Sequence, residues 1–263
     1  MKVAGATALV TGATGGLGAA IARGLRARGA EVIVTGRRAD VLEELARELG
    51  ARPVVADVAD RDDVARLARE CDEVDVLVAN AGLPADGPAL EYTPEQIDRA
   101  VDVNLRAPIQ LARALAEPMV ARGRGHLVFM SSLSGKAATA GAALYNATKF
   151  GLRGFATALR ADLRSSGVGV SAVFPGFIRE AGMFADAQVS LPPGVGTRSP
   201  EDVARAVVTA IERNRGEIDV APLPLRAGTV LAGLAPELSA TLARRLGSEA
   251  ISRRIGAGQR DKR

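Results

Sequence analysis

The sequence predicts an α/β fold, with a doubly wound, parallel, seven-stranded β-sheet covered by helices on both faces. Short runs rich in β-branched residues alternate along the 263-residue chain with longer amphipathic runs, an order typical of strand–helix–strand units. The strand runs are almost continuously apolar, which indicates strands buried on both faces. Right-handed crossovers between parallel strands then produce the doubly wound arrangement.

Each predicted element follows from this alternation. Strands are expected at Ala8–Thr11, Val32–Thr35, Pro53–Ala56, Val76–Ala79, His126–Ser131, Gly169–Phe174 and Glu217–Ala221. Helices are expected at Leu17–Arg28, Val41–Leu49, Asp62–Arg69, Pro94–Arg122, Ala143–Arg164 and Pro200–Asn214. No break in composition divides residues 1–222, so a single domain is expected there.

Two segments depart from the alternation. Residues 177–199 form a long connection rich in Gly, Pro and apolar residues, as expected of a loop over a substrate. Residues 223–263 are expected to form a helical C-terminal extension of the same domain. Its apolar residues recur at helical intervals, at Val230, Leu231, Leu234, Leu238, Leu242 and Leu246. The extension could cover the active site, pack in a subunit interface or rest on a membrane surface, and packing within the protein or its oligomer is the default.

Composition and charge argue against several functions. The net charge is +4, yet basic and acidic residues alternate along most predicted helices, as they do on a solvated surface. Nucleic-acid binding would need a clustered basic stripe with stacking aromatics, and aromatics make up only 3% of the chain. The densest basic stretch is the tail, which we interpret as solubilising. It contains Arg244, Arg245, Arg253, Arg254, Arg260, Lys262 and Arg263.

Several features predict a cytoplasmic protein without a transmembrane segment. Cys71 is the single cysteine, so no internal disulfide can form, and this fits a reducing compartment. No apolar stretch approaches the ~20 residues that a membrane-spanning helix needs, and no signal peptide is expected. His126, the only histidine, has no Cys or carboxylate cluster around it, so we expect a structural role and no metal site.

A glycine-rich turn follows the first predicted strand and opens the first predicted helix. It reads Thr11-Gly12-Ala13-Thr14-Gly15-Gly16-Leu17-Gly18. Glycines allow the backbone to turn sharply and to approach a pyrophosphate, whose charge is stabilised by the helix N-terminus. An ordinary glycine-rich turn is the alternative, but the strand–turn–helix placement favours dinucleotide binding.

Tyr145 and Lys149 lie four residues apart in a predicted helix, so their side chains share one face. A lysine cation beside a phenol favours the phenolate, so we expect the pKa of Tyr145 to fall below its usual value of about 10. Such a phenol is a usable proton donor or acceptor. The pair alone is common on helix surfaces, but Ser132 precedes Tyr145 by thirteen residues, at the end of a predicted strand.

The Thr-Gly-x3-Gly-x-Gly form of the turn, followed by Ser132, Tyr145 and Lys149, resembles the short-chain dehydrogenase/reductase family in its compact subclass. The resemblance covers about the first 220 residues and includes Asp57-Val58, Asn80-Ala81-Gly82, Asn104 and Pro175-Gly176. It implies a Rossmann-type fold and a homodimer or homotetramer formed through the two long helices. It also implies cofactor binding by Gly12, Thr14, Gly15, Gly16, Leu17, Gly18, Arg37, Arg38, Asp57, Val58, Asn80, Ala81, Gly82, Tyr145, Lys149, Pro175, Gly176 and Ile178.

The end of the second strand favours NADP(H) over NAD(H). A carboxylate at this position binds the free ribose 2′-hydroxyl of NAD, whereas an arginine without a carboxylate admits the 2′-phosphate of NADP. Here the chain reads Thr35-Gly36-Arg37-Arg38. Gly36 replaces the acid of NAD-preferring relatives, and a planar guanidinium suits a phosphate. The alternative is that both arginines merely extend into solvent.

The resemblance also assigns catalytic roles. Tyr145 would transfer a proton to a substrate carbonyl oxygen, Lys149 would lower the pKa of the phenol, and Ser132 would hydrogen-bond the same oxygen. Asn104 would hold a water that relays protons to Lys149. Ser131 and Ser134 are rivals for the serine role, but the spacing to Tyr145 selects Ser132.

Two positions depart from the family pattern. Glu180 stands where relatives often carry a Thr that holds the nicotinamide carboxamide, and Ala79 stands where many carry Asn. The first change leaves the placement of the nicotinamide open. The second should be tolerated, because the backbone forms that turn.

These features predict an NADP(H)-dependent oxidoreductase that transfers hydride between the nicotinamide and a carbonyl or alcohol substrate. An apolar loop face indicates a substrate with hydrophobic bulk. This face comprises Phe177, Ile178, Met183, Phe184, Val189 and Leu191. The alternatives are a non-catalytic, NADP(H)-binding redox-sensing regulator, an NAD-linked alcohol dehydrogenase, and an isomerase or dehydratase on the same fold.

Overall fold

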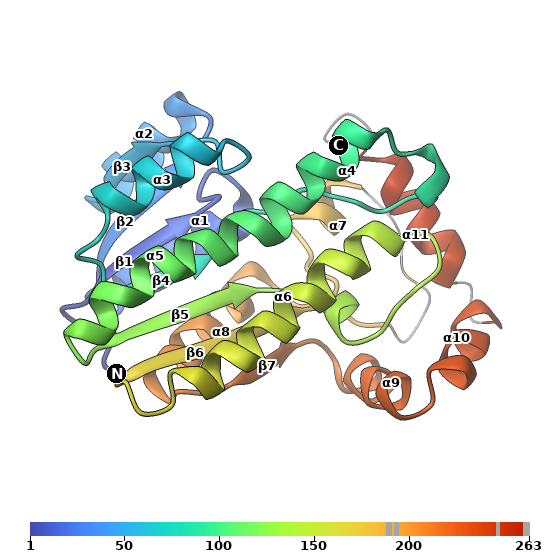
Figure 1. Ribbon diagram of the computed structural model, residues 1–263. Coiled ribbons are helices and arrows are strands. Elements are labelled where there is room, and N and C mark those ends of the chain that lie inside the picture. Colours follow the sequence, from blue (N-terminus) through green and yellow to red (C-terminus); the bar gives the residue numbers. More distant parts are fainter. Residues whose placement is uncertain (188–190, 192–194, 246–247, 260–263) are drawn as a thin grey trace.

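The computed structural model describes residues 1–187, 191, 195–245 and 248–259. Seven parallel strands form one sheet in the order β3-β2-β1-β4-β5-β6-β7, which confirms the predicted doubly wound α/β fold (Figure 1). The strands are β1 (Thr7–Thr11), β2 (Glu31–Gly36), β3 (Arg52–Val55), β4 (Val76–Ala79), β5 (Gly125–Met130), β6 (Val168–Pro175) and β7 (Glu217–Val220). Each lies within two residues of its predicted bounds.

Two hydrophobic cores lie on the two faces of this sheet, because alternate strand residues point to opposite sides. Leu9 and Phe129 point to the face covered by α3 (Arg61–Glu70), α5 (Ala107–Ala121) and α6 (Ala143–Asp162). Val10 and Val128 point to the other face, which is covered by α1 (Gly16–Ala27), α2 (Ala39–Leu49) and α8 (Pro200–Glu212). The chain has no Trp, so Ala, Val, Leu and Ile fill most of both cores.

Side chains cap the N-termini of several helices. The Asp60 carboxylate accepts hydrogen bonds from the first turn of α3. Thr93 and Ser199 form capping boxes at α4 (Pro94–Val101) and α8, each followed by a proline in the first turn. By contrast, the N-cap residue of α1 is Gly15, which provides no side-chain cap, so the amides of the first turn stay available to another partner.

The predicted helix at residues 94–122 is interrupted. After α4, residues Asp102–Arg106 form a π-helical turn, and the regular helix resumes as α5. A π-turn inserts one extra residue into the helical repeat and commonly marks a functional position. Asn104 lies in this turn and is completely buried.

The two segments outside the alternation contain short helices. The connection after β6 includes α7 (Met183–Asp186), and its ends are joined by backbone hydrogen bonds between residues 177–179 and Arg198. Val189, one of the predicted apolar loop residues, lies outside the described residues. The C-terminal segment contains α9 (Leu223–Leu234), α10 (Pro236–Arg245) and α11 (Ser248–Ala257), which lie beyond the carboxyl ends of the strands (Figure 1). Leu246 also lies outside the described residues.

Candidate active site

A cleft of about 1700 Å³ opens at the carboxyl ends of the strands. This is the edge at which open α/β sheets bind ligands. All of the predicted cofactor and catalytic residues line the cleft except Gly18 and Asn104, which lie behind its wall. The structure therefore brings together residues as far apart in the chain as Gly12 and Ile178.

The glycine-rich turn is packed too closely for side chains at two positions. Gly12 has a φ of +66°, and a Cβ there would lie 2.8 Å from the Cα of Ala81. A Cβ on Gly18 would lie 2.3 Å from the carbonyl oxygen of Gly12. Asn80 fastens the turn, since its Nδ2 donates a 2.9 Å hydrogen bond to the carbonyl oxygen of Thr11. These contacts hold the uncapped first turn of α1 at the cleft wall, where its amides can bind an anion.

The end of β2 carries the basic residues proposed to recognise the cofactor. A Cβ on Gly36 would lie 2.8 Å from Cγ2 of Thr14, so a side chain at this position would have to push the Thr14 side chain aside. The Arg38 guanidinium donates a hydrogen bond to the carbonyl oxygen of Thr14 and thereby supports the turn. Arg37 is half-exposed, with Nη1 lying 3.7 Å from Oδ2 of Asp57.

Arg99 is a third arginine at this end of the cleft, beside Arg37 and Arg38, and no sequence motif pointed to it. It projects from α4, lines the cleft, and places Nη2 3.8 Å from the same Asp57 oxygen. Two guanidiniums therefore flank one carboxylate, which leaves net positive charge at the end of the cleft opposite Lys149. No motif in the sequence connects Arg99 with Asp57, because α4 lies about 40 residues further along the chain. Only the folded structure brings the two side chains together.

The predicted catalytic side chains gather where β5 ends and α6 begins. Lys149 is buried, and its Nζ donates a 2.9 Å hydrogen bond to the carbonyl oxygen of Met130. The same Nζ lies 5.6 Å from the centre of the Tyr145 ring. The Ser132 hydroxyl accepts a 3.2 Å hydrogen bond from the Ser134 amide and points toward the carbonyl oxygen of Pro175. The rival Ser131 instead donates to the carbonyl oxygen of Lys149. This bond fastens α6 to the segment between β5 and α6, residues 131–142, which we call the serine loop.

The expected depression of the Tyr145 pKa is not found in this structure, and that prediction was wrong. Burial raises the pKa of the phenol, the negative charge of Asp86 adds to the increase, and hydrogen bonding with Ser132 opposes it only in part. The same burial lowers the pKa of Lys149 from 10.5 to about 8. Desolvation thus outweighs the attraction between cation and phenolate, because Lys149 turns its charge to the carbonyl oxygen of Met130.

Asn104 connects the π-turn to the strand-end turn at residues 80–83. Its Oδ1 accepts a 2.7 Å hydrogen bond from the Leu83 amide, and its Nδ2 donates a 3.0 Å bond to the Leu83 carbonyl oxygen. A Cβ built on Gly82 would lie 3.4 Å from Asn104 Oδ1 and 3.8 Å from Lys149 Nζ. Asn104 therefore reaches the region of Lys149 while it orders the backbone beside it.

Glu180 occupies an unusual backbone conformation in the loop after β6. Its φ is +70°, a region that residues other than glycine rarely adopt, and it lines the cleft. Its carboxylate pairs with Arg179 at 2.8 Å on the protein surface. Nearby, the rings of Phe177 and Phe184 pack with centres 5.1 Å apart and give the loop an apolar face.

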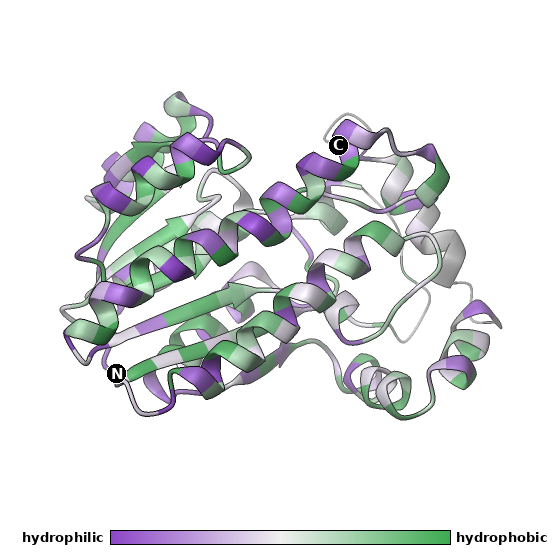
Figure 2. Ribbon diagram, viewed as in Figure 1, coloured by the Kyte–Doolittle hydropathy of each residue, from purple (hydrophilic) through white to green (hydrophobic). Residues whose placement is uncertain are grey.

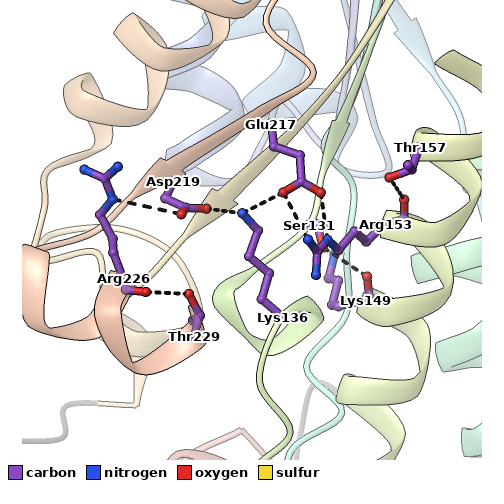
Figure 3. Close-up of polar contacts among 9 residues, drawn as sticks. All are labelled: Ser131, Lys136, Lys149, Arg153, Thr157, Glu217, Asp219, Arg226 and Thr229. Atoms are coloured by element: carbon purple, nitrogen blue, oxygen red, sulfur yellow. Dashed lines mark hydrogen bonds and ion pairs between the residues drawn. The ribbon is translucent and has the colours of Figure 1, made fainter. Parts of the chain in front are cut away.

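An ion-pair network fastens the serine loop to β7, α6 and α9 (Figure 3). Lys136, one residue after the short helical turn Leu133–Gly135, places Nζ 2.6 Å from an Asp219 oxygen and 2.8 Å from a Glu217 oxygen. Arg153 of α6 pairs with Glu217 at 2.7 Å, and Arg226 of α9 lies 3.9 Å from Asp219. Since Arg153 lies one helical turn beyond Lys149, the network braces the segments that carry Ser132 and Lys149.

His126 and Cys71 lie outside the cleft. The His126 ring is buried, and its Nε2 lies 2.7 Å from the Ser171 hydroxyl, which itself donates to the Arg215 carbonyl oxygen. Burial raises the pKa of the Cys71 thiol, as expected of an unreactive side chain. Among the described residues, no group of three or more His, Cys, Asp or Glu side chains could hold a metal ion.

The fit of the cleft to a dinucleotide rests on three observations. The glycine turn leaves space that a Cβ would fill, the first turn of α1 has uncapped amides, and basic side chains lie at the end of the adjacent strand. Together they form a cradle for a phosphate-bearing nucleotide on a doubly wound parallel sheet. The opposite part of the cleft brings together Ser132, Tyr145 and Lys149.

Comparison with known proteins agrees with this class. The sequence matches the family described as short chain dehydrogenase over residues 6–190. The ketoacyl reductase HetN of Nostoc sp. is 34% identical over 230 residues, which cover 84% of this chain and 80% of that protein. A 3-oxoacyl-(acyl-carrier-protein) reductase, FabG, of Rickettsia bellii is 31% identical over 240 residues, covering 88% and 99%.

A solved structure of similar fold belongs to the same class of protein. The short-chain dehydrogenase from Sphingobium yanoikuyae in complex with NADPH matches with a TM-score of 0.78 and 28% identity, covering 89% of this chain and 94% of that one. The present chain belongs to the short-chain dehydrogenase/reductase family. It is therefore an oxidoreductase by family and a Rossmann-type protein by fold.

Proposed function

We propose that the protein is an NADP(H)-dependent carbonyl reductase or alcohol dehydrogenase whose substrate has hydrophobic bulk. The convergence of Ser132, Tyr145 and Lys149 on one wall of the cleft carries this proposal. A redox sensor would not need a positioned proton donor, so this arrangement favours turnover. The relatives named as ketoacyl reductases support a carbonyl substrate.

The chain's own residues supply proton transfer and orientation. When bound, the nicotinamide supplies or accepts the hydride. In the reductive direction, the Tyr145 hydroxyl donates its proton to the carbonyl oxygen, while the Ser132 hydroxyl donates a hydrogen bond that holds this oxygen in place. Lys149, whose pKa is about 8, is the member of the pair that titrates near neutrality, so it can restore the proton of Tyr145. Asn104 orders the adjacent backbone and would hold the water through which that proton arrives.

Preference for NADP(H) is part of the proposal. Gly36 leaves no carboxylate to bind a free 2′-hydroxyl, and the exposed guanidinium of Arg37 can bind a 2′-phosphate through paired hydrogen bonds. Arg99 adds positive charge on the other side of Asp57. The remaining predicted contacts come from the glycine turn, Asn80–Gly82 and the segment from Pro175 to Ile178.

Residues 1–222 would act as the catalytic domain, with residues 223–263 as its helical extension. We also propose a homodimer or homotetramer formed through α5 and α6, which expose Val120 and Phe150. Light scattering coupled to gel filtration tests the assembly, and a monomer at working concentration would contradict it.

The decisive experiment combines a carbonyl panel with a conservative substitution. Wild-type protein should oxidise NADPH in the presence of bulky apolar ketones, followed at the nicotinamide absorbance. Tyr145→Phe removes only the hydroxyl, so turnover should fall by about 100-fold or more while NADPH binding persists. Full turnover by Tyr145→Phe would refute the assignment, and failure of wild type on the whole panel, with NADPH bound, would refute the proposed activity.

A further inference from the structure

The C-terminal extension presents a cluster of apolar side chains to solvent. Of the ten large hydrophobic residues that are exposed in the described part of the chain, five lie on α9 and α10. They are Leu223, Val230, Leu234, Leu238 and Leu242, and we call them the apolar patch. Leu234 is 81% exposed and Leu223 is 73% exposed, values at which these side chains make few contacts within the protein.

The spacing of the patch residues places them along one side of each helix. Leu223, Val230 and Leu234 recur at intervals of seven and four on α9, and Leu238 and Leu242 at an interval of four on α10. The two helices pack against each other at the periphery of the molecule, and much of α9 is apolar (Figures 1 and 2). Large contiguous apolar patches on soluble proteins generally mark interaction sites.

The charge of the chain is concentrated in the same extension. Residues 223–263 contain eight Lys or Arg and three Asp or Glu, a net charge of +5, while the whole chain carries +4. Residues 1–222 are therefore slightly acidic, at −1. The extension alone thus combines exposed apolar side chains with excess positive charge, the combination that binds a lipid bilayer containing anionic headgroups.

Two other occupants fit less well. A second copy of the chain would meet this surface through a two-fold interface and would bring two extensions of charge +5 together, at an electrostatic cost. A spanning arrangement is also disfavoured, because no helix in the described ranges is long and apolar enough to cross a membrane. Helices of ten to twelve residues can instead lie in the plane of the headgroups.

We propose that α9 and α10 dock the protein on anionic lipid bilayers, with the apolar patch entering the headgroup region. Leu242 belongs to the patch and also lines the cleft, so the docked surface is continuous with the proposed active site. Apolar substrates dissolved in the bilayer would thereby reach the cleft from the lipid phase. Docking itself does not depend on the proposed reaction, because it rests only on the surface of the extension.

Vesicle flotation tests the docking directly on the full-length protein. We expect at least about fivefold more protein to float with vesicles in which phosphatidylglycerol replaces about a third of the phosphatidylcholine than with phosphatidylcholine alone. The double substitution Leu234→Asn and Leu238→Asn should abolish this difference. Neither residue lines the cleft, so NADPH binding should stay unchanged and thereby confirm that the variant is folded.

Leu90→Asn is the matched control, because Leu90 is fully exposed but belongs to neither α9 nor α10 and lies on the 3-10 turn Ala89–Glu91. It should float as wild type does. Raising the salt concentration from about 0.1 M to about 1 M should reduce flotation, since it screens the attraction between Arg residues and lipid. No flotation of wild type, or equal flotation of the double variant, would overturn the proposal. A lipid-free oligomer that the double substitution dissociates would assign the patch to a subunit interface and would also overturn it.

Discussion

Arg37 lies where a single charge can select between two cofactors. Its guanidinium is half-exposed and lines the cleft, and Gly36 beside it supplies no carboxylate that could bind a free ribose hydroxyl. Arg37→Asp should weaken NADPH binding by about tenfold or more, because a carboxylate would face the 2′-phosphate. NADH binding should change by less than about threefold. Calorimetric titration of both cofactors measures the contrast, and equal losses would eliminate the phosphate role.

Gly18 is required because its Cα lies too close to neighbouring backbone atoms for a side chain to fit, and not because of its backbone conformation. A Cβ at this position would lie 2.3 Å from the carbonyl oxygen of Gly12, and backbone atoms cannot easily move away. Gly18→Ala should therefore lower the free energy of unfolding by about 1–3 kcal/mol. Gly15→Ala is the control within the same turn, since its Cβ would lie 3.4 Å from that oxygen, close to ordinary contact. Urea unfolding without cofactor should show a much smaller loss for the control; similar losses would mean that the turn relaxes.

The ion-pair network around Lys136 holds the serine loop against β7. Lys136 is mostly buried and contacts two carboxylates, and its ammonium also lies 4.0 Å from the centre of the Phe174 ring. Burial alone would raise the pKa of Glu217, but its hydrogen bonds to Arg153 and Lys136 lower it. Glu217 therefore stays ionised beside Lys136 at neutral pH, and Lys136 bridges it to Asp219.

Lys136→Met should destabilise the protein by about 2–4 kcal/mol, because it leaves Glu217 and Asp219 close together without their shared cation. It should also lower turnover, since the loop that carries Ser132 loses its anchor. Arg153→Met, which removes a more exposed partner of Glu217, should cost less than about 1 kcal/mol. Urea unfolding and steady-state kinetics measure both effects. A Lys136→Met variant as stable as Arg153→Met would show that the network contributes little.

Structural features that depend on local sequence were predicted correctly for this chain, whereas features that depend on tertiary packing were not. Strand positions and the parallel sheet follow from local apolar runs, and each of β1 to β7 lies within two residues of its predicted bounds. Local motifs also placed Tyr145 and Lys149 on one helix. The pKa of Tyr145 was predicted wrongly, because it depends on burial by distant segments and on where Lys149 directs its proton. Arg99 and the π-turn at Asn104 were missed for a related reason, since both depend on the tertiary position of α4, which packs against α6.

Global stability should depend on pH through the one histidine of the chain. Burial, with help from the positive charges of the N-terminus and Arg160, lowers the pKa of His126 from 6.5 to about 3. Between these values the unfolded chain binds a proton that the folded protein does not, so the free energy of unfolding falls as pH falls. The expected loss from His126 between pH 7 and pH 4.5 is about 2–3 kcal/mol.

His126→Gln separates this contribution from that of the carboxylates. The Gln amide can still donate a hydrogen bond toward Ser171 but cannot take up a proton. The free energy of unfolding of the variant should therefore decline less steeply below pH 6.5 than that of the wild type. Urea unfolding of both proteins at several pH values between 4.5 and 7.5 gives the difference in slope. Parallel curves would mean that the folded protein accommodates a protonated His126, and that the ring is less isolated from water than its burial indicates.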